Sequence, residues 1–419
     1  MRVMVKVAVG LFAAAFLGNV AYAQAPDREA GSERRSVLQK PRPDYDPLGA
    51  HVGSFLLLPS VDVQESYDTN VYATASNEKQ DFYTTVRPEV QLKSDWSNHA
   101  LAFQASGDMK RYNERVTENV TNYATSVQGR LDVLRDSYLM AGAGYQFLHE
   151  DRSSPDAAST RKPVEYSVTS GNVGYSHERG VLGGRVNFYA DSYDYKNGVN
   201  GSGASVLEDD RDRVEYRAVP RLSYEIVRNY NAFIETAFNW RDYSRARDGN
   251  GFNRDSHGYA INLGTAIDLT QVINGEVFAG YINQDYDDAR LKTASGFGFG
   301  ANLLWNITDL TSLRLAAAHT AEETTVSGAS SYVQSLFRVN VEHELRRNIL
   351  LTGVLGYTNQ DYQGVSRSDD LYTAGVGLRY LLSRNLSARL DFLYSERNAG
   401  LATANFDRAL TTAGLRLQF

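Results

Sequence analysis

The chain has 419 residues and a formal net charge of −7 at pH 7. It contains no cysteine, which excludes disulfides, thiolate metal sites and lipid attachment to an N-terminal cysteine. An acidic chain without a dominant basic face argues against nucleic acid as a partner. The 27 tyrosines and 34 glycines, against 4 methionines, favour strands over helices. No apolar window of about 18 residues follows the N-terminus, so no membrane-spanning helix is expected.

The first residues are typical of an export signal. Arg2 and Lys6 supply positive charge ahead of the apolar run 7–18. The sequence "AYA", which ends at Ala23, has the small-x-small form that signal peptidase recognises, so cleavage is expected after Ala23. Residues 1–23 are therefore predicted to be a signal peptide, with a short N-terminal anchor helix as the alternative.

The rest of the chain divides into two predicted parts. Residues 24–52 are charged and contain prolines without periodicity, which predicts a flexible periplasmic extension. Residues 53–419 alternate apolar and polar side chains in blocks of about 10–16 residues, the period of strands with two different faces. In the block 213–226, Tyr216 and Leu222 lie on an apolar face, and arginines and glutamates occupy the other face.

The connections between blocks alternate between tight and long. Long polar segments separate tight turns near residues 95–98, 134–137, 178–180, 227–229, 269–271, 308–310, 346–348 and 383–385. This pattern predicts about eighteen strands, with sixteen as the alternative because the hairpin 53–94 is the weakest. Asn229, Asn348 and Asn385 suit turn positions with positive φ.

Short turns at one end and longer loops at the other are typical of outer-membrane barrels. Propellers have four strands per repeat and β-helix repeats are shorter, so neither architecture fits. The predicted fold class is an all-β, transmembrane, antiparallel up-and-down barrel with periplasmic turns and extracellular loops. Its apolar face would contact outer-membrane lipid and lipopolysaccharide, and closure would leave no edge strand.

Aromatic residues lie near strand ends on the predicted apolar face. They fit an interfacial girdle, and ordinary cross-strand packing is the alternative. The examples are Phe82, Tyr224, Trp240, Trp305, Tyr380 and Tyr394.

Two segments resemble known proteins. The ending "TAGLRLQF" resembles the C-terminus of outer-membrane proteins at Thr412, Gly414, Leu417 and Phe419, which implies recognition by the barrel-assembly machinery. The segment "SVDVQESYDTNVYATAS", followed by "DFYTTVRPEVQLKSDWSNHALAF", resembles the opening of the putative β-barrel porin 2 family over about residues 45–419. Members of that family often accompany exopolysaccharide or capsule export systems, so the resemblance implies polysaccharide export proteins as partners.

A barrel of this size encloses an aqueous channel, so its inward-facing residues are the functional candidates. Two interpretations of the inward arginines stay open: cross-strand ion pairs, or a track for anions centred on Arg213, Arg217 and Arg221. The predicted lumen-lining arginines are Arg185, Arg213, Arg217, Arg221, Arg338, Arg379 and Arg389.

No catalytic, metal or cofactor site is expected. The seven histidines are scattered and lack metal-ligand spacing. The sequence "LHEDR" places His149, Glu150 and Asp151 at an outer strand end, where a solvated charged rim is the simpler interpretation than a hydrolase site. The glycine-rich "GFGFGAN" continues as a strand without a helix, unlike a phosphate-binding loop.

The predicted function is a porin-like channel for passive passage of small hydrophilic solutes. One alternative is a barrel component of exopolysaccharide or capsule export, and another is a structural or adhesive barrel with a closed lumen. No loop exceeds about 15 residues, so a long loop folded into the pore is not expected. Any constriction would come from wall side chains or the N-terminal segment.

Overall fold

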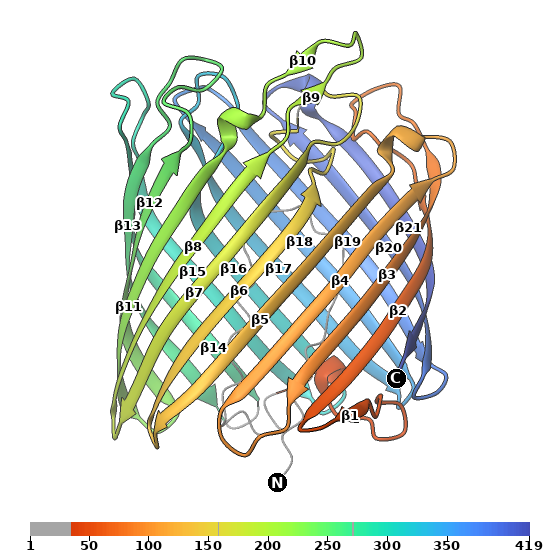
Figure 1. Ribbon diagram of the computed structural model, residues 1–419, viewed down its shortest axis with the longest axis vertical. Coiled ribbons are helices and arrows are strands. Elements are labelled where there is room, and N and C mark those ends of the chain that lie inside the picture. Colours follow the sequence, from red (N-terminus) through yellow and green to blue (C-terminus); the bar gives the residue numbers. More distant parts are fainter. Residues whose placement is uncertain (1–34, 158, 270–271) are drawn as a thin grey trace.

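Eighteen strands close into one antiparallel barrel in the computed structural model (Figure 1). The structure describes residues 35–157, 159–269 and 272–419, so the predicted signal peptide and its cleavage site lie outside the described residues. The predicted fold class and the count of eighteen strands are confirmed, and the alternative of sixteen is wrong. None of the helices among the described residues is long and apolar enough to cross a membrane.

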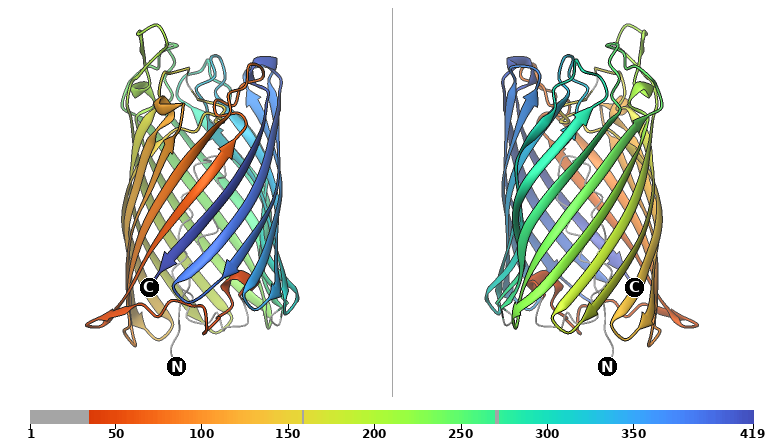
Figure 2. Two further views of the ribbon diagram at one scale, coloured as in Figure 1. Left: turned by 90° about the vertical axis from the view of Figure 1, so that its right-hand side faces the viewer. Right: turned by 90° about the vertical axis from the view of Figure 1, so that its left-hand side faces the viewer.

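Strands that follow one another in the chain are neighbours in the barrel, and β2 pairs with β21 to close it (Figure 2). A short strand β1 (Ala50–Val52) pairs with the start of β2, and β9 (Gly198–Val199) pairs with β10 (Ser205–Val206) in one long loop. The wall strands are β2 (Phe55–Asp68), β3 (Asp81–Ser94), β4 (Ala100–Tyr112), β5 (Val120–Leu134), β6 (Ser137–His149), β7 (Glu165–Arg179), β8 (Leu182–Tyr195), β11 (Arg213–Val227), β12 (Tyr230–Tyr243), β13 (Ser256–Leu269), β14 (Ile273–Tyr286), β15 (Ala294–Thr308), β16 (Thr311–Glu323), β17 (Ser331–Arg346), β18 (Ile349–Gln363), β19 (Ser368–Leu381), β20 (Leu386–Ala399) and β21 (Phe406–Gln418).

Helical structure among the described residues is confined to single 3₁₀ turns outside the wall strands. These turns are η2 (Val37–Gln39), η3 (Val116–Glu118), η4 (Asp209–Arg211) and η5 (Ala402–Ala404).

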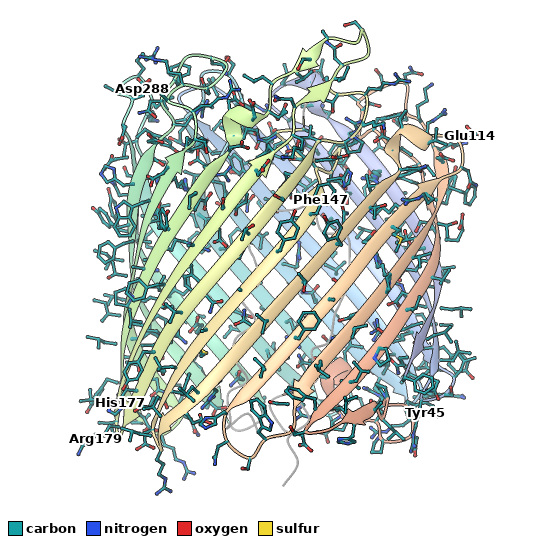
Figure 3. The ribbon with its side chains drawn as sticks, viewed as in Figure 1. Tyr45, Glu114, Phe147, His177, Arg179 and Asp288 are labelled. Carbon is teal, nitrogen blue, oxygen red and sulfur yellow. The ribbon has the colours of Figure 1, made fainter. Side chains whose placement is uncertain are left out.

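The two ends of the barrel differ as the sequence predicts. Tight turns and the chain's C-terminus lie at one end, and the longer connections lie at the other (Figure 1). Figure 3 shows His177 and Arg179 at the tight-turn end with Tyr45, and Glu114 and Asp288 at the loop end. In an outer-membrane barrel the tight-turn end is periplasmic.

Burial is inverted relative to a water-soluble protein. Large apolar side chains such as Leu222 (66% exposed) and Phe297 (64% exposed) cover the outside, whereas Asp68 (0%) and Asp369 (1%) are buried. The girdle candidates Phe82, Tyr224, Trp240, Trp305 and Tyr380 are likewise exposed, and Tyr394 is half-buried. An apolar outer face with a polar inner face suits a wall between lipid and an aqueous lumen.

The prediction of positive φ at the turn asparagines is confirmed only for Asn229, whose φ is 72°. It is wrong for Asn348 and Asn385, neither of which is among the described residues with positive φ. The connection that contains Asn385 is longer. The backbone N–H of Asn385 donates a hydrogen bond to the Ser383 hydroxyl (3.2 Å), so the side chain of Ser383 organises this turn. Nothing in the structure explains the difference at Asn348.

The described part of the predicted N-terminal extension is not free along its whole length. The 3₁₀ turn η2 lies inside the tight-turn end of the barrel in both views (Figures 1 and 2), and Val37 is fully buried there. The prediction of a flexible extension over residues 24–52 thus stays a prediction, and within its described part residues 36–42 contact the polar inner wall.

Candidate channel lumen

The inner wall of β8, β11, β12 and β14 carries a network of ion pairs. Arg221 contacts Glu235 (3.4 Å) and Glu276 (2.6 Å), and its guanidinium lies 3.5 Å from the ring centre of Phe233. Arg185 also contacts Glu235, at 3.7 Å. These residues occupy inward positions that alternate with exposed residues such as Leu222, as the strand period requires.

The three arginines proposed as an anion track are each paired with carboxylates. Besides the contacts of Arg221, Arg213 contacts Glu215 (2.8 Å) and Arg217 contacts Asp191 (3.1 Å). Arg213 is thus paired along its own strand, and Arg217 and Arg221 are paired with carboxylates of other strands, so the track on β11 carries little unbalanced positive charge.

A second arginine group lies on the inner wall near the tight-turn end. Arg379 on β19 and Arg389 on β20 are direct cross-strand partners. Arg389 contacts Asp391 (2.9 Å), and Arg416 contacts Asp62 (2.7 Å). Acidic neighbours therefore balance much of this cluster too.

Among the described residues, Arg379 has no hydrogen bond or ion pair of its own, but Asp391 and Asp62 interact with it electrostatically. Arg338 on β17 shows no such interaction with a carboxylate of the described ranges. No hydrogen bond or ion pair joins its guanidinium to another residue of the described ranges, and it lines a cavity in the lumen. Its cross-strand partners are Ala316 on β16 and Gly356 on β18, which offer no charge. The structure thus places the predicted lumen arginines on inward rows but separates Arg338 from the paired networks.

A cavity near the loop end, here called the outer vestibule, is acidic. Nine carboxylates and four guanidinium groups line it, together with five tyrosines. Arg241 on β12 reaches Glu323 at the end of β16, and the Tyr243 hydroxyl donates a hydrogen bond to the same carboxylate (2.8 Å). Because β12 and β16 are not neighbours, this contact bridges separate parts of the wall.

The connection after β6 folds into the lumen, although the sequence predicted that no long loop would fold into the pore. Residues 150–157, here called the infolded loop, contact strands that do not border β6 or β7. The Arg397 guanidinium on β20 donates to the Ser153 carbonyl (2.7 Å), and the Thr324 hydroxyl after β16 donates to Asp156 (2.7 Å). Loop length did not predict this arrangement, because a loop of moderate length can contact distant strands when it folds inward from the rim of the barrel.

Ion pairs fix the base of the infolded loop. Arg152 binds both carboxylate oxygens of Glu118 at 2.9 Å, and Glu150 contacts Arg211 at 2.9 Å. Burial raises the pKa of Glu150, and the Arg211 guanidinium opposes this shift. These contacts hold the loop across the lumen instead of letting it extend into solvent.

Asp151 supplies a pH-dependent contact of the infolded loop. Burial alone would raise the pKa of Asp151, but Arg408, Lys110 and hydrogen bonds from Ser153 lower it to about 2. The carboxylate–Arg408 contact (3.6 Å) is therefore present above the ordinary pKa and is lost as the pH falls through about 2. Single-channel current noise of the Asp151→Asn variant should exceed that of the unaltered protein at pH 7 and at about pH 4. This difference should vanish towards about pH 2, and equal noise at pH 7 would contradict the role of Asp151.

At the tight-turn end, the N-terminal segment (residues 36–42) is bound to the wall. The Val37 N–H donates to the Ser312 hydroxyl (2.9 Å), and the Leu38 N–H donates to Glu342 (2.8 Å). Arg42 forms a 2.6 Å ion pair with Glu344, and both side chains are more than nine-tenths buried. The lumen is thus narrowed from both ends. The docking of the N-terminal segment agrees with the expectation that this segment could constrict the lumen. The individual partners of both segments were not predictable, since polar segments lack the periodicity that reveals a partner.

The histidine of the "LHEDR" segment has hydrogen-bonding and acidic neighbours at the loop end. His149 hydrogen-bonds Asn122 (2.8 Å) and lies near Glu165 (3.6 Å). Within the described ranges, no group of three histidine, aspartate or glutamate side chains is arranged to hold a metal ion.

The residues of the expected assembly signal lie on both faces of β21. Leu417 (56%) and Phe419 (71%) are exposed on the outer row. Thr412 is buried and its hydroxyl hydrogen-bonds Ser66 (2.9 Å). A side chain at Gly414 would meet Gln64 at 2.7 Å, so glycine allows β2 to approach at the closing seam.

Comparison with known proteins gives one family and several barrels of similar fold. The family model described as putative beta-barrel porin 2 matches residues 42–419. No curated protein matches the sequence. The siderophore receptor PirA from Acinetobacter baumannii is 6% identical, with a TM-score of 0.48 over 87% of this chain and 80% of that one. A mutant of the ferric enterobactin receptor PfeA from Pseudomonas aeruginosa is 8% identical, with a TM-score of 0.46 over 87% and 80% of the two chains. The outer membrane protein OpdK from P. aeruginosa is 11% identical, with a TM-score of 0.44 over 87% and 99%.

Proposed function

Since the chain belongs to the putative β-barrel porin 2 family, we propose that it is a passive channel for small hydrophilic solutes in the bacterial outer membrane. The observation that carries this proposal is the inverted barrel with a charged inner wall. The ion pairs of β8, β11, β12 and β14 keep polar groups in the lumen while holding its net charge low. Such a wall suits water and small solutes better than it suits lipid.

Conductance of the purified protein in planar bilayers tests this proposal. A steady conductance from the barrel alone is expected, because the cavities at both levels lie between wall side chains and not within a filled core. A protein that inserts as a barrel but carries no current would contradict the channel and would favour the structural barrel.

The paired wall predicts how one substitution changes ion selectivity. Arg221→Gln removes the guanidinium that lies between Glu235 and Glu276, which leaves carboxylate charge facing the lumen. The reversal potential in a salt gradient should shift towards cation preference, and about a doubling of the cation-to-anion permeability ratio is expected.

The control for Arg221→Gln is Arg228→Gln, in the exposed turn after β11, which should leave selectivity unchanged. An unaltered reversal potential in Arg221→Gln would show that the pair does not face the conducting path.

We also propose that the barrel-assembly machinery recognises the end of β21. Phe419 is 71% exposed on the outer row, where no lumen contact depends on it. Deleting Phe419 should lower the amount of barrel in the outer membrane about tenfold or more, as measured by heat-modifiable migration of membrane fractions. Deleting Leu401, an exposed residue of the last loop, is the control and should change insertion little. Normal insertion without Phe419 would refute the role.

A further inference from the structure

The lumen wall is chemically asymmetric around Arg338. On β8, β11 and β12 the inner positions carry paired charges, such as Arg217 with Asp191. The cavity beside Arg338 is bounded instead by strands β16–β21, by β3 and β4, by the infolded loop and by the N-terminal segment. Two of its other cations are paired with carboxylates: Arg314 contacts Glu342 (3.1 Å) and Arg408 contacts Asp68 (2.5 Å). The third, Lys110 on β4, lies 5.9 Å from the ring centre of Tyr83 and interacts electrostatically with Asp151, on the side of the cavity formed by β3, β4 and the infolded loop.

An apolar surface lies on the same cavity wall. It is formed by inward side chains that a polar channel does not need for solvation: Leu336, Val354, Leu371, Leu393 and Leu410. Leu393 and Leu410 are direct cross-strand partners on β20 and β21. A side chain at Gly375 would come within 3.0 Å of both Leu393 and Val354, so these two residues close over the glycine and make the surface continuous.

Arg338 borders this apolar surface. Leu336 lies two residues away on the inner row of β17, and Val354 lies diagonally across on β18, beside Arg338's partner Gly356. Uncharged polar side chains, among them Thr373, Ser395 and Asn340, also line the cavity. A guanidinium without a carboxylate partner, set beside leucines, is complementary to a ligand with one anionic group and one apolar body.

We propose that this cavity binds small amphipathic carboxylates, with the carboxylate on Arg338 and the apolar body on the leucine surface. A planar guanidinium binds a carboxylate through two parallel hydrogen bonds, which fixes the orientation of the ligand. The apolar body gains by leaving water on the leucine side. The inference deepens the proposed channel function, which supplies the route to the cavity, and names a solute class for it.

Two simpler ligands fit the cavity less well. An inorganic anion such as phosphate would bind Arg338, but it would lose hydration water beside the leucines and form no hydrogen bond there in exchange. A neutral apolar alcohol would pack against the leucines, but it would leave the Arg338 guanidinium without a charged partner. The acidic outer vestibule slows the approach of any anion from the loop end, so binding is best measured at equilibrium.

The test is ¹⁹F NMR of 4-fluorobenzoate with the full-length protein in lipid nanodiscs, corrected for empty nanodiscs. Saturable line broadening is expected for 4-fluorobenzoate. The dissociation constant should rise about tenfold or more in Arg338→Gln, because a charged hydrogen-bond donor is lost. Leu393→Asn should weaken binding about threefold to tenfold by removing apolar contact. Arg228→Gln, in the exposed turn, is the matched control and should bind as the unaltered protein does.

Equal binding by Arg338→Gln and the unaltered protein would overturn the site. Equal binding of 4-fluorobenzyl alcohol, or displacement of the probe by phosphate as effective as displacement by benzoate, would overturn the amphipathic class. The readout does not require current. A barrel that binds the probe but does not conduct would therefore refute the proposed channel and support the binding site. A barrel that conducts but does not bind the probe would support the channel and refute the binding site.

Discussion

Replacing residues 152–157 with two glycines is expected to raise single-channel conductance at least about twofold. The replacement removes Arg152, which anchors the infolded loop to Glu118, and Asp156, which holds it to Thr324 on the opposite rim. Without these contacts the loop can no longer span the lumen, so the narrowest cross-section near the loop end should widen. The measurement is the conductance of the purified variant in planar bilayers at fixed salt.

A matched control shortens a loop that points away from the lumen. Deleting residues 201–203 removes the tip of the β9–β10 hairpin, which projects beyond the barrel (Figure 1). This deletion should leave conductance unchanged. If both deletions change conductance equally, or if neither does, the infolded loop is not the constriction.

Arg42→Ala is expected to release the N-terminal segment from the tight-turn end of the barrel. The Arg42–Glu344 pair is buried, and removing one member of a buried pair costs about 3–5 kcal/mol because the other charge stays desolvated. The remaining hydrogen bonds between the segment and the barrel contribute about 1 kcal/mol each, and those made by Lys40 and Pro41 are exposed and contribute least. Their sum is of the same size as the loss, so the docked state no longer dominates. The docked segment should therefore open to solvent.

Because the chain has no cysteine, one introduced thiol reports this release cleanly. Val37→Cys replaces a fully buried side chain and should resist a membrane-impermeant maleimide in otherwise unaltered protein. Combined with Arg42→Ala, it should label rapidly. Combined with Lys40→Ala, which removes only an exposed hydrogen bond to the Asp309 carbonyl, it should stay protected. Protection in the Arg42→Ala background would contradict the role of the buried pair.

The architecture was predictable because the strand period has two unequal faces. Alternation such as that of Tyr216 and Leu222 against the arginines of β11 assigns each side chain to lipid or lumen without knowledge of its neighbours. The eight tight turns then set the strand number and the orientation of the ends. Within the barrel wall the errors were local, such as the positive φ predicted for Asn348 and Asn385.

The sequence was sufficient to predict which arginines face the lumen, but not which residues pair with them. The sequence placed Arg217 and Arg338 on the inner face alike, yet Arg217 meets Asp191 on the neighbouring strand and Arg338 faces glycine and alanine. Which residues stand opposite depends on register, and one residue of slip would exchange every partner. The sequence interpretation therefore centred the anion track on β11, where the structure balances the charge.

The sequence by itself determined a lipid-facing, closed barrel with a charged interior, because a period of two is a local property of the backbone. It predicted about eighteen strands, and the structure excluded the alternative of sixteen. Only the tertiary structure decided what narrows and specialises that interior. The infolded loop meets Arg397, and the N-terminal segment meets Glu344, across sequence separations of 244 and 302 residues. Neither segment carries a periodic pattern, so the partners of Ser153 and Arg42 exist only once the wall has closed around them.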